Sequence, residues 1–191
     1  MNTLEQEYRR IAQRHWDAER HFFARVVLAS SVMRVFRPGT RPRLFSALLR
    51  VELEPLKSLS SHHQFKEYFE TELDRLSRVI AKTNKGNTRI YPGYKWGHGT
   101  KILCLFLRDV VLHSHYFSTG VAHRVSRLLY TPIDKVVIRR LKALGCVTEF
   151  KSIKDIDSPG KYFSVQSALQ KAAAAVGIPR IWFDDNWGQR I

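Results

Sequence analysis

Cysteine, acidic residues and long apolar runs are scarce in this sequence. The two cysteines, Cys104 and Cys146, are too few for a disulfide scaffold, and the histidines show no metal-ligand spacing. No apolar run reaches the ~20 residues that a membrane-spanning helix needs. The first residues lack the apolar core of a signal peptide. We therefore expect a cytoplasmic protein that has no membrane partner and needs no metal or organic cofactor.

The shortage of acidic residues leaves a strong positive charge. Only 17 residues are Asp or Glu against 32 Lys or Arg, a net charge of +15. Residues 145–191 contain six basic and five acidic residues, whereas the window 95–144 contains nine and two, a net charge of +7. Such a field favours a polyanion partner, nucleic acid first. An anionic membrane surface and a solvated basic surface are the alternatives.

Strand alternation is also missing, and helical periodicity recurs, so the sequence predicts an all-α fold. Hydrophobic residues make up 44% of the chain and aromatic residues 12%, which is enough for a core. A chain of this length predicts one compact domain over 1–191. We expect irregular connections at 114–133 and 150–162. The expected helices lie at 3–36 (as one or two), 43–50, 62–82, 101–113, 135–144 and 164–176.

Lys101 opens a helix that is apolar on nearly every side, directly after the turn Gly97-His98-Gly99-Thr100. A lysine is rarely buried without a partner or a chemical task. Burial, a helix N-terminus and neighbouring cations all lower a lysine pKa, which would free the amine as a nucleophile. The glycine-containing turn predicts backbone N–H groups that hold a phosphate, with Lys95 beside them.

Asp134 follows Pro132 and precedes a predicted helix that Gly145 ends, so we expect Asp134 to cap this helix. A carboxylate near C1′ of a nucleotide stabilises the oxocarbenium-like sugar that forms during base excision. An amine that attacks C1′ forms a Schiff base, which allows strand cleavage by elimination. Lys101 and Asp134 are the candidate catalytic pair. The simpler interpretations are a phosphate contact for the lysine and a plain N-cap for the aspartate.

The segments Gly97-His98-Gly99-Thr100-Lys101 and Pro132-Ile133-Asp134 together resemble the HhH-GPD superfamily of DNA glycosylases. The long spacing from lysine to aspartate is most similar to the archaeal 8-oxoguanine DNA glycosylase (AGOG) branch. The tail segment Gly177-Ile178-Pro179, with Asp184 and Trp187 behind it, is similar to the same branch. The resemblance covers roughly 60–191. It implies a helix-hairpin-helix at about 84–113 and C-terminal helices over 134–191 that complete a base pocket.

Carried over by position, the resemblance implies that Lys101 is the Schiff-base nucleophile and Asp134 the catalytic aspartate. It implies backbone contacts to DNA from Lys95, Gly97, His98, Gly99 and Thr100. It further implies a base pocket formed by Leu105, Arg108, Asp184 and Trp187. The chain departs from the family pattern in three places: Leu105 replaces an aromatic residue, His62 stands where the family has a tryptophan, and the tail is one residue shorter between Asp184 and Trp187.

The implied function is that of a monomeric DNA glycosylase with AP-lyase activity, associated with the nucleoid. Its substrate would be double-stranded DNA, from which it flips out and excises a modified purine, 8-oxoguanine first. Two other functions stay open. One is a non-catalytic DNA-binding protein of the same fold. The other is a glycosylase for a different modified base, for example on phage DNA.

Overall fold

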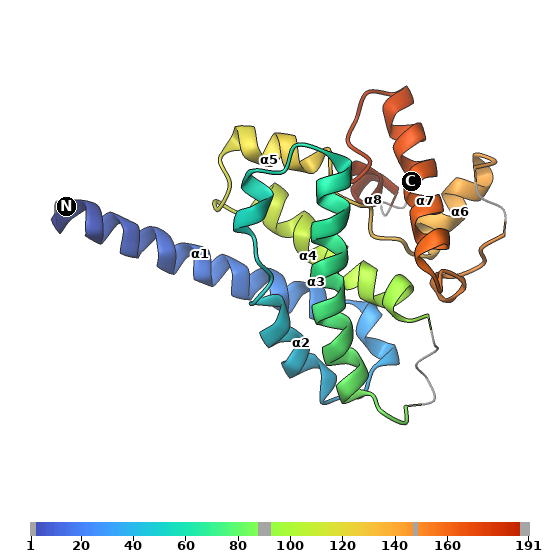
Figure 1. The fold of residues 1–191 in the computed structure, drawn as a ribbon, viewed down its shortest axis with the longest axis horizontal. Coiled ribbons are helices and arrows are strands. Elements are labelled where there is room, and N and C mark those ends of the chain that lie inside the picture. Colours follow the sequence, from blue (N-terminus) through green and yellow to red (C-terminus); the bar gives the residue numbers. More distant parts are fainter. Residues whose placement is uncertain (1–2, 88–92, 147–148, 188–191) are drawn as a thin grey trace.

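The computed structural model describes residues 3–87, 93–146 and 149–187, without the side chains of residue 3 and residues 185–187 (Figure 1). These residues form helices and turns and no strand, which confirms the all-α prediction. The elements are α1 (Thr3–Ala29), η1 (Ser31–Val35), α2 (Thr40–Leu48), η2 (Glu54–Lys57), α3 (His62–Thr83), η3 (Lys95–Gly99), α4 (Thr100–His113), α5 (Thr119–Ser126), α6 (Lys135–Ala143), η4 (Ile153–Asp155), α7 (Pro159–Ala175) and α8 (Trp182–Trp187).

Helices α3 and α4 lie at the centre of the fold (Figure 1). The hydroxyl of Ser61 caps α3 by accepting from the Gln64 amide at 3.2 Å, which satisfies one of the first N–H groups of the helix. α4 packs against α1, α3 and α5, and most of its side chains are buried, as expected for a helix that is apolar all round. The buried stripe of α3 consists of Phe65, Phe69, Leu73, Leu76 and Ile80.

Helices α5 and α7 are among the helices that differ from the expectation; α2 also spans 40–48 rather than 43–50, and α8 lies outside the expected helix ranges. Helix α5 occupies 119–126, inside the segment expected to be irregular, and α7 begins at Pro159 rather than at residue 164. A serine caps both α5 and α7: Ser118 accepts from the Val121 amide at 3.5 Å, and Ser158 caps α7, whose first residue is the proline. Caps and a proline at the first helical position are local start signals. The hydrophobic periodicity alone did not reveal them.

Helix α1 extends beyond the rest of the fold (Figure 1). Its second half packs against α2 and α4 and buries Trp16, Phe23 and Val27. Residues 4–15, in contrast, are exposed on every side. Across the described residues, no helix combines the length and the apolar character that crossing a membrane requires.

Candidate active site

Lys101 and Asp134 meet in space although 33 residues separate them in the sequence. The Lys101 Nζ donates to Asp134 Oδ2 at 3.3 Å, and the two side chains are 15% and 33% exposed. The lysine stands in the first turn of α4, and the aspartate stands directly before α6. Two rigid helix ends thus hold an amine and a carboxylate opposite each other.

The two oxygens of Asp134 have different partners. Oδ1 accepts from the amides of Val136 and Val137 at 2.8 and 3.0 Å, so the predicted N-cap is confirmed. Oδ2 faces Lys101. The helix ends before Gly145, whose φ of 69° lies in the region that glycine adopts without strain. Because the cap fixes one oxygen, the orientation of the other oxygen is fixed too.

A cavity of about 260 Å³ adjoins the pair. The cavity is open to solvent and its lining is largely polar. Residues from five parts of the chain form this lining. A small polar molecule or a single extruded group that entered here would meet the amine and the carboxylate together. The lining residues are Ser31, Val32, His98, Lys101, Asp134, Lys135, Ser152 and Ile153.

His98 forms part of this cavity wall and is 6% exposed. Burial, followed by the positive charges of Lys101 and Lys154, lowers the pKa of His98 to about 4. The imidazole is therefore neutral at pH 7. Its ring also packs edge-on against Phe36, with 6.1 Å between the centroids. The charge of Lys101 is thus not joined by a second charge from this histidine.

The prediction that backbone N–H groups of the turn 97–100 bind a phosphate is wrong for the amides of Gly99 and Thr100. Gly97, His98, Gly99 and Thr100 are all buried. The Gly99 amide donates to the Tyr94 carbonyl at 2.9 Å, and the Thr100 amide donates to carbonyls of η3. The physical reason is that η3 is a π-helical turn that runs into α4, so the helix itself uses these donors.

Lys95 lies at the start of the same turn and already has an acidic partner. Its Nζ contacts Asp74 of α3 and lies 4.9 Å from the centroid of the Trp96 ring. Gly93, just before it, approaches Asp157 so closely that a Cβ would lie 2.2 Å from the Asp157 Cα. The segment 93–95 is therefore held by contacts with α3 and with Asp157.

Some of the residues predicted to form the base pocket lie close together in the structure. Arg108 of α4 and Asp184 of α8 form an ion pair, and Arg108 Nε also donates to Asp109 at 2.8 Å. Leu105 lies on the same side of α4, one turn from Lys101, and is half-buried. None of these predicted residues lines the cavity beside Lys101. Trp187 belongs to the last turn of α8, but its side chain lies outside the described residues.

The sequence analysis missed the residues that hold the segment leading to Asp134. This buried segment, 128–131, is not helical, so its polar backbone groups need partners. The side chain of Gln166 supplies two: its Oε1 accepts from the Thr131 amide at 3.1 Å, and its Nε2 donates to the Thr131 carbonyl at 2.8 Å. In the sequence, the indication of this role was a polar glutamine on the face of α7 that is otherwise apolar and buried.

Arg180 supplies further partners for the same segment and is 4% exposed. Its guanidinium donates to the carbonyls of Leu128 and Leu129 at 2.9 and 2.8 Å and lies 4.4 Å from the centroid of the Tyr130 ring. Burial lowers its pKa from the ordinary value, and the nearby Tyr130 acts in the opposite direction. An arginine between Pro179 and Ile181 was the only sequence signal for this clamp.

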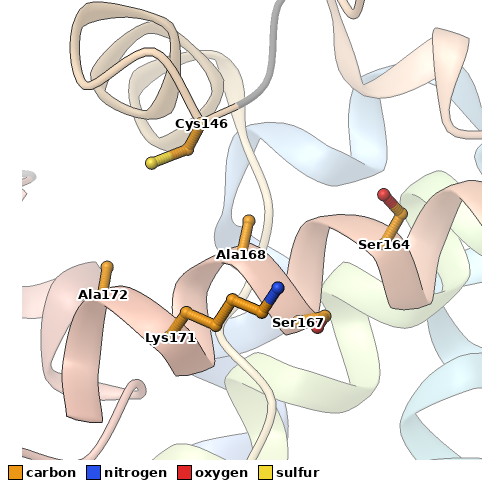
Figure 2. Close-up of a pocket in the computed structure, with 6 residues that line it drawn as sticks. All are labelled: Cys146, Ser164, Ser167, Ala168, Lys171 and Ala172. Carbon is orange, nitrogen blue, oxygen red and sulfur yellow. The ribbon is translucent and has the colours of Figure 1, made fainter. Parts of the chain in front are cut away.

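A second cavity, of about 410 Å³, lies beside α7 (Figure 2). It shares no residue with the first cavity. Lys171 extends along the helix in Figure 2, and the exposed Cys146 lies across the cavity from this helix. The remaining lining residues are small: Ser164, Ser167, Ala168 and Ala172. No carboxylate lines this cavity, so it offers no counterpart to the pair of Lys101 and Asp134.

Comparisons with known proteins add no relative. No family model, curated protein or solved structure matches this chain. Over the described ranges, no group of three or more His, Cys, Asp or Glu side chains is gathered in a way that could hold a metal ion. The candidate site therefore rests on the geometry around Lys101 and Asp134.

Proposed function

We propose that this protein is a DNA glycosylase with AP-lyase activity, in which Lys101 is the nucleophile and Asp134 the catalytic carboxylate. One observation carries the proposal: the amine and the carboxylate that the HhH-GPD resemblance pairs lie 3.3 Å apart at the edge of an open polar cavity. The two residues lie in segments 33 residues apart in the sequence. Their proximity depends on the tertiary fold and supports the resemblance independently of the motif.

The chemistry follows from the two groups. The unprotonated amine of Lys101 attacks C1′ of the extruded nucleotide, and the bond from C1′ to the base breaks with the electron pair leaving on the base. The carboxylate of Asp134 stabilises the positive charge that develops on the sugar. Opening of the sugar ring gives a Schiff base between C1′ and Nζ. Loss of a proton from C2′ then expels the 3′ phosphate and cuts the strand.

Because the amides of Gly99 and Thr100 are used within the chain, the DNA backbone contacts need further donors. Lys135 lines the cavity and is exposed, and Lys154 of η4 is exposed and close enough to lower the pKa of His98. We place the phosphates that flank an extruded nucleotide beside these two lysines. We assign them the positioning role, which carries no sequence information. For the base itself, 8-oxoguanine is the first candidate because the resemblance implies it.

Borohydride trapping tests the proposal. The protein is incubated with a duplex that contains one 8-oxoguanine, reduced, and analysed for a covalent protein–DNA adduct. The wild type and Lys171→Met should form the adduct, because both retain the amine beside Asp134. Lys101→Met should form none. Lys171 is the matched control, since it is a lysine that lines the separate cavity beside α7.

A panel of other modified duplexes and an abasic duplex separates the remaining functions. An adduct with a different base would keep the lyase mechanism and change the substrate. Binding that weakens steeply with salt, without an adduct on any substrate, would instead indicate a non-catalytic DNA-binding protein. Salt-insensitive binding would contradict the role assigned to the basic surface.

A further inference from the structure

In the first half of α1, the ion pairs among the described residues lie within the helix itself, as between Arg9 and Glu5 at 2.7 Å. Residues 4–15 are exposed on every side, and the helix projects away from the fold at this end (Figure 1). An isolated helix of 12–15 residues is only marginally stable in water. At ~1.5 Å per residue, this arm is about 18 Å long. A helical arm of this kind gains stability when a second surface covers one of its faces.

One face of the arm is patterned for such a surface. Six residues recur at alternating steps of four and three, the spacing of a coiled-coil seam. This seam lies on the side of the helix away from the buried residues Trp16, Phe23 and Val27. Its large apolar members Leu4, Tyr8, Ile11 and Phe22 are between 43% and 63% exposed. The seam consists of Leu4, Tyr8, Ile11, His15, Ala18 and Phe22.

The charges beside the seam select a second copy of the same arm in the antiparallel direction. When Tyr8 of one arm lies opposite Ile11 of the other, Leu4 lies opposite His15. This register brings Glu7 beside Arg14 at two symmetric places. Glu7 is more than half exposed, and among the ion pairs of the described residues it has only the 4.0 Å contact with Arg10. The arm therefore complements itself in charge as well as in shape.

The parallel direction is less favourable. It would place Arg14 beside Glu19 of the second copy, but Glu19 already accepts from the His115 amide at 2.9 Å and contacts the His115 ring. The antiparallel direction also places the two folded bodies at opposite ends of the paired arms. It closes a two-fold dimer, because the same patch serves both subunits.

We propose that residues 4–15 bind the same segment of a second copy of this chain as an antiparallel helix pair. This departs from the monomer expected from the sequence, and it uses no residue of the proposed active site. The two proposals can therefore fail separately. The contact is short, so the dimer is concentration-dependent rather than permanent.

Sedimentation equilibrium over a wide concentration range, with the full chain, tests the pairing. The wild type should pass from monomer to dimer. Glu7→Arg and Arg14→Glu should each weaken dimerisation about ten-fold or more, because each creates two like-charge contacts. An equimolar mixture of the two variants should dimerise again, because both contacts are then attractive. Circular dichroism controls for loss of the fold.

Disulfide cross-linking tests the direction. In a Cys146→Ser background, with Cys104 buried, a mixture of Leu4→Cys and His15→Cys chains should form a disulfide between unlike chains. A preference for like chains would indicate the parallel direction and overturn the register. A wild type that stays monomeric at millimolar concentration, or a variant mixture that fails to dimerise, would overturn the pairing itself.

Discussion

Two cations of helix α4, Lys101 and Arg108, lie seven residues apart on one side of the helix, and each contacts aspartates. We call Lys101 with Asp134 the first pair and Arg108 with its two aspartates the second pair. In the first, Lys101 faces a single oxygen of Asp134 at 3.3 Å, beside a cavity of about 260 Å³. In the second, Arg108 is held between Asp109 and Asp184, whose side chains are 7% and 13% exposed. The two cations are similarly exposed, at 15% and 18%, but Asp134 is more exposed than Asp109 and Asp184, and Arg108 has more acidic partners than Lys101.

The difference indicates separate roles. A charge that is buried between two partners stabilises the fold only while all members are present, because removing one leaves a desolvated charge behind. A charge with one long contact next to open space can exchange its partner for a substrate atom at small cost. We therefore assign chemistry to the first pair and the attachment of α8 to α4 to the second.

Replacing the cation of the first pair should produce the largest effect. Lys101→Met removes the amine that faces Asp134, so the trapped adduct should vanish and base excision should fall by at least ~10³-fold. The free energy of unfolding should change by less than about 1 kcal/mol, because Asp134 keeps its two amide donors. Trapping and urea denaturation measure the two effects. A large loss of stability would remove the contrast between the pairs.

Replacing the cation of the second pair should give the opposite pattern. Arg108→Met leaves Asp109 and Asp184 without this guanidinium, and breaking a buried pair costs about 3–5 kcal/mol of unfolding free energy. The fraction that remains folded should still form the adduct, since Lys101 and Asp134 are unchanged. Urea denaturation gives the stability, and trapping below the unfolding midpoint gives the activity. If base excision disappears while the free energy of unfolding stays constant, Arg108 acts in the reaction rather than in holding the fold.

The features of the site that were predictable depend on local sequence. Two patterns lie within a few residues of sequence. One is the helix that is apolar all round, and the other is Asp134 followed by a helix that Gly145 ends. The structure contains both helices, as α4 and α6. Capping geometry is determined by backbone amides next to the residue, so sequence position suffices. The proximity of Lys101 to Asp134 was an expectation from the resemblance, since no local pattern specifies it.

The features that were not predictable depend on contacts between distant segments. The amides of Gly99 and Thr100 looked free for a phosphate, but the π-helical turn uses them. The support of segment 128–131 comes from Gln166 and Arg180, between 35 and 52 residues away. A buried backbone needs such partners, but which side chain supplies them depends on the packing of α7 and on the course of the chain before α8.

Replacing the carboxylate of the first pair should give a smaller effect than replacing its lysine. Asp134→Asn retains an oxygen for the cap, so the structure should persist while the negative charge is lost. Single-turnover base excision should then slow by about 10²–10³-fold. Asp134→Ala should lose the same activity and an additional ~1 kcal/mol of unfolding free energy, because the cap is lost as well. Equal rates in wild type and Asp134→Asn would assign Asp134 to the cap alone.

The smallest expected effect concerns His98, which lines the cavity of the first pair. Its pKa is lowered to about 4 by burial first and by Lys101 and Lys154 next, whereas an unfolded histidine titrates near ~6.5. Between these values the unfolded chain binds more protons, so stability falls as the pH falls. Between pH 7 and pH 5 this histidine should account for a loss of about 2 kcal/mol. His98→Gln should lose correspondingly less in urea denaturation at the two pH values. Identical pH dependence in both proteins would mean that His98 is not held neutral beside Lys101.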